Sequence, residues 1–401
     1  MTNMSKKELL DEVKPRYLKA DKKEKGRILD EFCLNTGYVR KYAINILQAR
    51  YDYHWVKREG RKRRKKTYGS ATLAVIIKIW EWLEYPCGSR LQPVLLSTAE
   101  ALERFNEINL NEIIRSDLQK ISSKTLDRRL KRERQIRRLN RNRGATRHGS
   151  LLKSSIPIRI TDWDTSRIGF LEMDTVDHNG GEASGERIYS LDMVEIYSGW
   201  SEQIAVMGKG ETGVTAAVDS VKSEVPFDIK GLDSDSGGEF INWHMVNYCD
   251  RNKIFFTRSR PDRKNDNAYV EQKNYTHIRQ WLGYGRYDTI EQLKLINGLY
   301  RHELRLFNNF FRPVMKIESK EKINNSICRK KYDTAKTPYR RLLDCPQISE
   351  AKKRELQAIY LSLNPAELKR QIDQKIKKIR QWQSKKLNVS TGGVWVRLLD
   401  D

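Results

Sequence analysis

Apolar residues recur at helical spacing near the start of the chain. They form two groups on either side of "NTGY": Ile28, Leu29 and Phe32, then Tyr42, Ile46 and Leu47. Spacings of three and four place such residues on one face of a helix. The pattern predicts two helices joined by a turn at Gly37, as in a helix-turn-helix. Arg40 and Lys41 begin the second helix, where DNA contacts are made in that motif, although any small helical hairpin has the same pattern.

The next stretch, "KREGRKRRKK" (57–66), has no apolar periodicity, and eight of its ten residues are basic. We interpret it as an arm that follows a phosphate backbone, or else as a solvated linker. Three of its residues are candidates for DNA contacts: Arg61, Arg63 and Arg64. Beyond it, helices are expected from about Ser70 to Glu84 and from Ser97 to Phe105.

A second helix-turn-helix is predicted around "LQKISSKTLDRRLKRERQIRRLNRNRG". Ser122 and Ser123 are candidate caps for a helix on which Leu126 and Leu130 face inward. Three arginines then project outward as further candidates for DNA contacts: Arg128, Arg129 and Arg132. Two such units in tandem favour sequence-specific DNA binding over a plain helical hairpin.

The pattern changes in the middle of the chain. Three stretches are rich in β-branched and aromatic residues and are broken by glycines: "IGFLEMDTVDH", "RIYSLDMVEIYSGWSEQIAVM" and "DIKGLDSDSG". They predict three to five strands. Helical stretches alternate with them or follow them, at residues 213–224, from Glu239 and from Asn267. Strands followed by alternating helices indicate an α/β domain with a mixed sheet.

The formal net charge of +25 is divided unevenly. Residues 1–150 carry +18, residues 151–315 carry −4 and residues 316–401 carry +11. This layout suggests flanking parts that bind phosphates around a middle part that uses carboxylates. We predict six segments: a helix-turn-helix domain (1–56), a basic linker (57–68), a second helical domain (69–132), a basic linker (133–163), a catalytic α/β domain (164–315) and a basic, mainly helical region (316–401).

Composition narrows the function classes. The longest apolar run is interrupted by Lys78 and Glu81, so no membrane span is expected. The N-terminus lacks the apolar centre of a signal peptide, which predicts a cytoplasmic location. The five cysteines are scattered and the six histidines lack ligand spacing, which argues against structural zinc.

Three carboxylates stand where such a sheet would bring them together. Asp174 lies in the first strand, within "LEMDTV", where an acid is costly to bury unless it is paired or coordinated. Asp235 ends a later strand before a glycine turn, and Glu271 lies on a helix, with 35 residues between the two. Divalent cations need oxygen ligands of this kind. Two such ions, about 3.5–4 Å apart, can bind the attacking and leaving oxygens of a phosphodiester.

The order and spacing of these acids resemble the DDE triad of transposases and retroviral integrases. Other stretches are similar to motifs of one group of bacterial insertion-sequence transposases with an integrase-type core: "EMDTVDHNGG", "DSDSGGEFIN", "RKNDNAYVEQKN", "YDTAKTPYRRLL" and "LNPAEL". The resemblance covers about residues 10 to 380. It implies all-α helix-turn-helix domains, then a ribonuclease H-like fold with a mixed five-stranded sheet and flanking helices, then a basic helical region. The chain departs from the pattern at Ser236, where Asn is usual, and at Tyr269, where His is expected.

The resemblance also implies roles for residues. Asp174, Asp235 and Glu271 would be catalytic acids that bind two Mg²⁺ ions, with Mn²⁺ able to substitute. Integrases often place a DNA-binding Lys one helical turn after the Glu, and here that position is Tyr275. Three residues nearby are candidates for contacts with a DNA end: Lys273, Asn274 and Arg279.

Plainer roles are expected for the remaining acids and aromatic residues. Asp233 is interpreted as an outer partner of the site or a solvated residue, and Glu239 as stabilising the N-terminus of the next helix. Asp177, Asp192 and His178 are expected to support the site or its loops without taking part directly. Trp200, Trp243 and Trp281 are expected in the core, whereas Tyr284 and Tyr287 fit either the core or a DNA-facing loop.

The combined hypothesis is a nucleoid-associated bacterial transposase that binds the terminal inverted repeats of its element and joins a 3′-OH to target double-stranded DNA. At least a homodimer is expected on DNA, because two ends must be joined in concert. Two alternatives stay open. One is a non-catalytic, domesticated transposase that acts as a sequence-specific repressor. The other is a structure-selective nuclease with a ribonuclease H-like fold.

Overall fold

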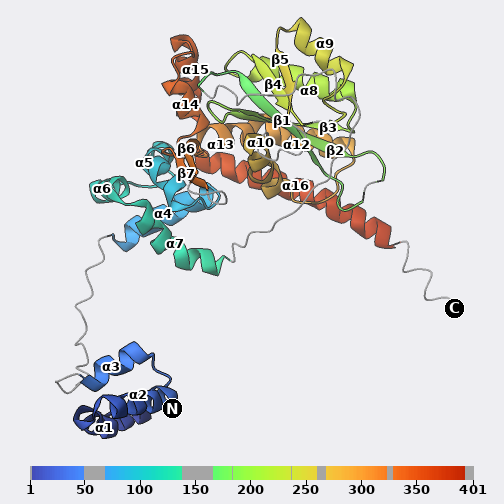
Figure 1. Cartoon of the computed structure of the whole chain (residues 1–401). Coiled ribbons are helices and arrows are strands. Elements are labelled where there is room, and N and C mark those ends of the chain that lie inside the picture. Colours follow the sequence, from blue (N-terminus) through green and yellow to red (C-terminus); the bar gives the residue numbers. More distant parts are fainter. Residues whose placement is uncertain are drawn as a thin grey trace, which may run out of the picture. The chain divides into compact units, whose positions relative to one another are not determined.

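The computed structural model describes residues 2–48, 68–137, 166–182, 184–235, 237–259, 268–322 and 328–392. The chain divides into two compact units, residues 1–67 and 68–401, which are drawn in Figure 1. The predicted arm with Arg61, Arg63 and Arg64 lies outside the described residues, as does Ser236. The boundaries that were predicted within the second unit stay predictions.

The first unit is a small helical domain of three helices: α1 (Asn3–Lys19), α2 (Lys22–Thr36) and α3 (Arg40–Gln48). Asp21 caps α2 by accepting a hydrogen bond from the backbone N–H of Glu24, and Gly37 ends the helix with φ 68°. The two predicted helices and their turn are confirmed. Tyr42 was expected on the inner face but is 46% exposed, because Ala43 turns inward beside Ile46.

The second unit begins with four helices: α4 (Ser70–Trp82), α5 (Gly88–Arg104), α6 (Glu112–Lys120) and α7 (Ser123–Ile136). The expected start of the second of these helices at Ser97 is wrong, because α5 already begins at Gly88. The predicted cap is confirmed, since the hydroxyl of Ser122 accepts a hydrogen bond from the backbone N–H of Thr125. Leu126 and Leu130 are buried as predicted.

A five-stranded mixed sheet forms the centre of the second unit. Its strands are β1 (Phe170–Asp177), β2 (Ile188–Glu195), β3 (Ser201–Met207), β4 (Gly231–Ser234) and β5 (Phe255–Arg258). The spatial order is β3-β2-β1-β4-β5. The pairs among the first three strands are antiparallel, whereas β4 runs parallel to both β1 and β5. The sheet and flanking helices that the resemblance predicted are confirmed.

Helices cover both faces of this sheet (Figure 1). The apolar face, with Leu171 and Met173, packs on α8 (Glu211–Glu224) and α9 (Trp243–Arg251). The other face meets a set of helical segments that follow one another along the chain: α10 (Ala268–Lys273), the π-helix η1 (Asn274–Arg279), α11 (Gln280–Leu282), α12 (Ile290–Leu299), the π-helix η2 (Tyr300–Leu304) and α13 (Arg305–Phe310).

The last part of the chain adds a small antiparallel sheet and three helices: β6 (Ile317–Lys322), β7 (Cys328–Tyr332), α14 (Pro338–Asp344), α15 (Glu350–Ser362) and α16 (Pro365–Gly392). α16 contacts both α12 and α5, and it therefore joins the helical and α/β parts of this unit. None of the helices in the described ranges is long and apolar enough to cross a membrane.

Candidate active site

Strand pairing places Asp174 and Asp235 beside each other. β1 and β4 are parallel neighbours, and their last paired residues are Met173 and Ser234. The next residue after each of them is an aspartate, Asp174 within β1 and Asp235 directly after the end of β4. Because side chains alternate along strands, both carboxylates leave the sheet on the face opposite Met173. Neighbouring strands lie about 4.8 Å apart, so two carboxylates meet at the same edge of the sheet.

Polar residues also stand beside Asp174 on the two antiparallel strands and form a row across the sheet with it. Asp174 is paired with Asp192 on β2, and Asp192 is paired with Gln203 on β3. Asp192 is fully buried and accepts a hydrogen bond from Nε2 of Gln203 at 2.9 Å. The expectation that Asp192 supports the site is consistent with this position, one strand behind Asp174.

Glu271 and Asn274 approach the row from the helical side. Glu271 is exposed on α10, and Asn274 begins η1 three residues later. Nδ2 of Asn274 donates a 2.6 Å hydrogen bond to Oδ2 of Asp174. Asn274 was predicted to contact DNA, and its amide nitrogen binds Asp174, one of the catalytic candidates. The remaining role at a DNA end stays a prediction.

The pKa of Asp174 reflects its burial and the charge of its neighbours. Burial and then the Asp235 carboxylate raise this pKa to about 7, with a smaller contribution from Glu271 included in that value. The hydrogen bond from Asn274 works in the opposite direction. Like charges held together in this way favour protonation unless a cation balances them.

The loop after β4 is held by hydrogen bonds to Asp235 itself and to the residue that follows Asp174. The backbone N–H of Gly237 donates to Oδ1 of Asp235 at 3.0 Å. Oε1 of Glu239 accepts hydrogen bonds from the Thr175 hydroxyl at 2.8 Å and from Nζ of Lys209 at 2.5 Å. Glu239 therefore joins the loop that carries Asp235 to the residue after Asp174.

This arrangement corrects the interpretation of Glu239. α9 begins only at Trp243 and is capped by Asn242, so Glu239 does not stabilise its N-terminus. Burial raises the pKa of Glu239, but the ion pair with Lys209 outweighs burial and leaves the pKa below its ordinary value. The Lys209 ammonium also lies close enough to interact electrostatically with Asp235. Sequence spacing gave no sign of Lys209, which lies in the connection between β3 and α8.

In the described part of the chain, the aspartate pair, without a third acid gathered beside it, is the donor set available for a divalent cation. Within the ranges that the structure describes, no three His, Cys, Asp or Glu side chains are gathered closely enough to hold a metal ion. Mg²⁺ usually takes one or two carboxylates together with waters and substrate phosphates, and the aspartate pair matches that requirement. Among the described residues, the buried Oδ2 of Asp192 and Oδ1 of Asn274 have no hydrogen-bond partner, so polar capacity beside Asp174 is unused.

Two nearby residues, His178 and Asp177, bind partners outside the aspartate pair. Nε2 of His178 lies 2.7 Å from the Ser190 hydroxyl, and burial and then Arg279 lower the His178 pKa to about 3. Asp177 is paired with Arg187 at 2.7 Å. His178 and Asp177 thus support the β1–β2 hairpin.

Asp233 is fully buried and accepts a 2.5 Å hydrogen bond from the Thr257 hydroxyl. The solvated alternative for this residue is wrong, and the outer-partner role stays a prediction.

Two of the cations predicted near the DNA end contact the protein itself. Lys273 is packed against His277, with 3.4 Å between Nζ and Nε2, and burial and nearby arginines lower its pKa to about 7. Nη2 of Arg279 donates to the carbonyl oxygen of Asp177 at 2.8 Å, and its guanidinium lies over the Tyr284 ring. A DNA contact by either side chain stays a prediction.

The cations predicted on the helix-turn-helix units are mostly on the surface. Lys41, Arg128 and Arg132 are exposed, and Arg40 is exposed while paired with Asp30. Arg129, in contrast, is half-buried on α7, and its Nη2 donates a hydrogen bond to the carbonyl oxygen of Tyr68 at 3.1 Å. The outward position predicted for Arg129 is therefore only partly correct.

The predictions for the aromatic residues are confirmed for some of them and wrong for one. Trp200 and Trp281 are buried as predicted, but Trp243 is 61% exposed at the first position of α9. The open question about the two tyrosines is resolved differently for each. Tyr287 is fully buried, whereas Tyr284 is 54% exposed.

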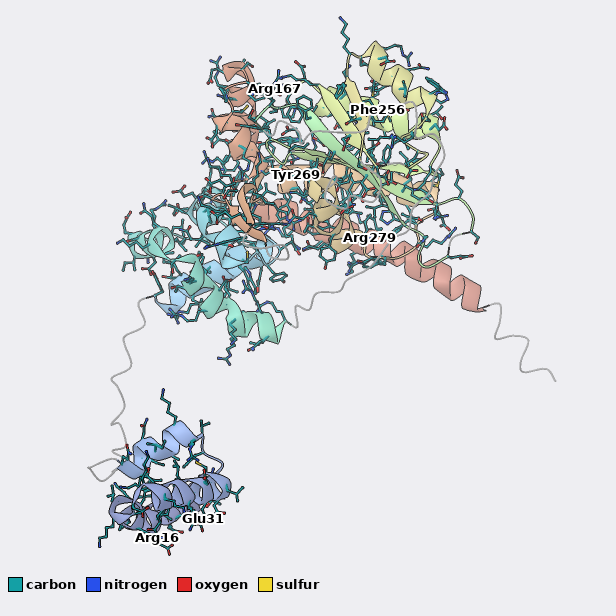
Figure 2. All side chains as sticks on the ribbon, in the orientation of Figure 1. Arg16, Glu31, Arg167, Phe256, Tyr269 and Arg279 are labelled. Atoms are coloured by element: carbon teal, nitrogen blue, oxygen red, sulfur yellow. The ribbon has the colours of Figure 1, made fainter. Side chains whose placement is uncertain are left out.

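One buried acid beside the site was not predicted. Glu172 lies two residues before Asp174 on β1, on the same face of the sheet, and is 1% exposed. Its carboxylate accepts hydrogen bonds from the first turn of α10, which carries Glu271 (Figure 2 labels Tyr269 there). The cost of an acid inside an apolar strand, which identified Asp174, applies equally to Glu172 and is the signal that could have found it.

Comparison with known proteins defines the family of this chain. No protein-family model matches it. The uncharacterized protein y4rM of Sinorhizobium fredii is 33% identical over 324 residues, which span 80% of this chain and 91% of that protein. The chain belongs to the same family as y4rM. The catalytic core domain of BIV integrase aligns with 43% of this chain and 91% of its own, at 17% identity and a TM-score of 0.27, a similarity too distant to bear on activity.

Proposed function

We propose that the protein is a DDE transposase of an insertion sequence, which cleaves DNA at the ends of its element and joins them to target DNA. One observation carries the proposal. It is supported by the pairing of β1 with β4 up to Met173 and Ser234, the residues directly before Asp174 and Asp235, and by the effect of the Glu271 charge on Asp174. The order of these acids and the motifs around them add support.

The residues of the chain have distinct roles in this proposal. Asp174, Asp235 and Glu271 would hold Mg²⁺, with Mn²⁺ as a substitute. Metal held by these residues would supply Lewis-acid chemistry, lowering the pKa of a water or hydroxyl nucleophile and balancing charge on the phosphodiester. Asn274 orients Asp174 through its 2.6 Å hydrogen bond, and the Gly237 N–H orients Asp235.

Lys209 offers a positive charge beside the pair. Its side chain is 43% exposed, and its ammonium group is bound to Glu239 at the loop after β4. A phosphate that approaches the aspartate pair meets this cation, so Lys209 is suited to bind the DNA backbone next to the scissile bond. Water and a DNA 3′-OH can occupy the same nucleophile position in turn, so cleavage and joining need no second set of residues.

DNA recognition is assigned to the helical parts. The exposed cations Arg40 and Lys41 on α3, and Arg128 and Arg132 on α7, would contact the terminal inverted repeats. Phosphate contacts of this kind position a protein on DNA, whereas base contacts set the sequence. Two ends must be held together for joining, so a homodimer or larger assembly on DNA is part of the proposal.

A strand-transfer assay tests it. The full chain is incubated with Mg²⁺, labelled DNA that ends in the element's inverted repeat, and a target plasmid. We expect joined products from the wild type and none from Asp235→Asn, which keeps the size of the side chain and removes its charge. Specific binding without products in either protein would favour the repressor alternative. Equal cleavage of DNA that lacks the repeat would favour the nuclease alternative.

A further inference from the structure

Glu172 occupies a costly position that the proposed roles do not use. It lies on β1 with 1% of its surface exposed, one alternation before Asp174 on the same face of the sheet. Its register partner on β4 is Asp233, which is also an acid. A buried carboxylate is destabilising unless hydrogen bonds or opposite charge compensate for the lost water. The compensation at Glu172 therefore indicates what it does.

Within the part of the chain that the structure describes, the start of α10 contributes to that compensation. Oε2 of Glu172 accepts hydrogen bonds from the backbone N–H groups of Tyr269 at 2.9 Å and Val270 at 3.1 Å. The first N–H groups of a helix have no acceptor within the helix itself. A negative charge at that end is also favourable because of the helix dipole. Glu172 thus caps α10 from β1, although it precedes Tyr269 by 97 residues and Val270 by 98 residues in the sequence.

The capped turn is the one that carries Glu271. Val270, the residue before it, is fully buried, and Asn274, three residues after it, is bound to Asp174 at 2.6 Å. β1 therefore holds this helical segment at two points, one on each side of Glu271. Both points on β1 are acids of the same face, Glu172 and Asp174.

We infer that Glu172 is a positioning residue that sets where Glu271 stands relative to Asp174. Its importance for catalysis rests on the proposed function, because the position of Glu271 matters to the reaction only if Glu271 is part of the active site. Glu172 itself need not touch metal or DNA. Loss of its carboxylate would free the first turn of α10 while leaving the aspartate pair on β1 and β4 in register.

The chain provides a matched control in Glu195. This residue ends β2 and is fully buried. It also accepts hydrogen bonds from backbone N–H groups, those of Gly169 at 3.3 Å, Tyr197 at 3.0 Å and Ser198 at 2.7 Å. These groups belong to the residue before β1 and to the turn after β2, not to α10. Substitution of Glu195 therefore removes an equally buried acid without releasing the helix that carries Glu271.

Hydrogen exchange provides the direct test. Full-length wild type, Glu172→Ala, Glu172→Gln and Glu195→Ala are compared without metal, in peptides that cover residues 268–273. We expect Glu172→Ala to speed exchange at least tenfold in these peptides, and Glu172→Gln to speed it less, because its amide oxygen still accepts. Glu195→Ala should leave these peptides unchanged. Wild-type exchange in Glu172→Ala would overturn the inference.

Metal binding and activity then separate positioning from plain stability. Loss of a residue that supports metal ligands typically costs about 10–100-fold in metal affinity or activity. We expect a loss of this size in Mn²⁺ affinity, measured by calorimetry, and in strand-transfer rate for Glu172→Ala, with DNA affinity unchanged and partial rescue in Glu172→Gln. Activity and Mn²⁺ affinity equal to those of the wild type in Glu172→Ala would refute it. If the wild type joins no DNA, the proposed function fails, and the exchange and Mn²⁺ results still decide the role of Glu172.

Discussion

Asp174→Asn should make the second unit more stable, by an amount that depends on pH. The folded state raises the pKa of Asp174 from an ordinary 3.8 to about 7, through burial and the neighbouring Asp235. An acid with a raised pKa binds protons more tightly when folded. The ionised carboxylate therefore destabilises the unit: the penalty is absent below the unfolded pKa, grows as pH rises and is complete above about pH 8. Asparagine keeps the shape of the side chain and carries no charge.

The size of the effect follows from the pKa difference. Each pKa unit corresponds to about 1.4 kcal/mol. Between pH 5 and pH 7 the penalty grows by less than two units, because the carboxylate is only half ionised at pH 7, so the advantage of Asp174→Asn should increase by about 2 kcal/mol across this range. Above about pH 8 the advantage should be constant.

Urea denaturation with EDTA measures this difference. Wild type and Asp174→Asn are unfolded at pH 5, 6, 7 and 8.5, and the transition of the second unit is followed by tryptophan fluorescence. Because the chain has two compact units, the transition of the first is fitted separately. Addition of Mg²⁺ should stabilise the wild type more than the variant at pH 8.5. If the difference in free energy of unfolding between Asp174→Asn and the wild type is the same at pH 5 and pH 8.5, the destabilising effect of the ionised Asp174 is refuted.

Three further predictions concern the surroundings of the site and the DNA-binding surface. Asn274→Leu removes the 2.6 Å hydrogen bond to Asp174 and should slow strand transfer about 10–100-fold at saturating DNA; an unchanged rate constant would contradict the role of Asn274. Lys209→Met leaves Glu239 without its ion-pair partner and should lower the free energy of unfolding by about 1–2 kcal/mol, a modest value because Lys209 is 43% exposed; equal urea midpoints would show the pair to be neutral. Arg128→Ala should reduce the slope of log affinity against log salt by about 0.9, measured by fluorescence anisotropy; an unchanged slope would remove Arg128 from the DNA contacts.

The sequence predicted the features that depend on periodicity and missed those that depend on distant partners. Asp174 and Asp235 could be placed at one edge because strand alternation and the glycine turn are local signals. The partner of Glu239 could not be predicted, since Lys209 lies 30 residues earlier and meets it only through the fold. Trp243 has a helical apolar context, but it stands at the first position of α9, where one side of the helix faces solvent.

The pairing of Met173 with Ser234 also limits how this sheet can change over evolution. A side chain on a strand has only two directions available, so a gain or loss of one residue within β4 would turn Asp235 toward the apolar layer formed with α8 and α9. Substitutions can adjust the site gradually, but a single-residue insertion in β4 would abolish the acid pair and disturb the core in one event. Length variation among relatives should therefore be confined to the connections, while β1 and β4 keep a fixed count of residues up to their aspartates.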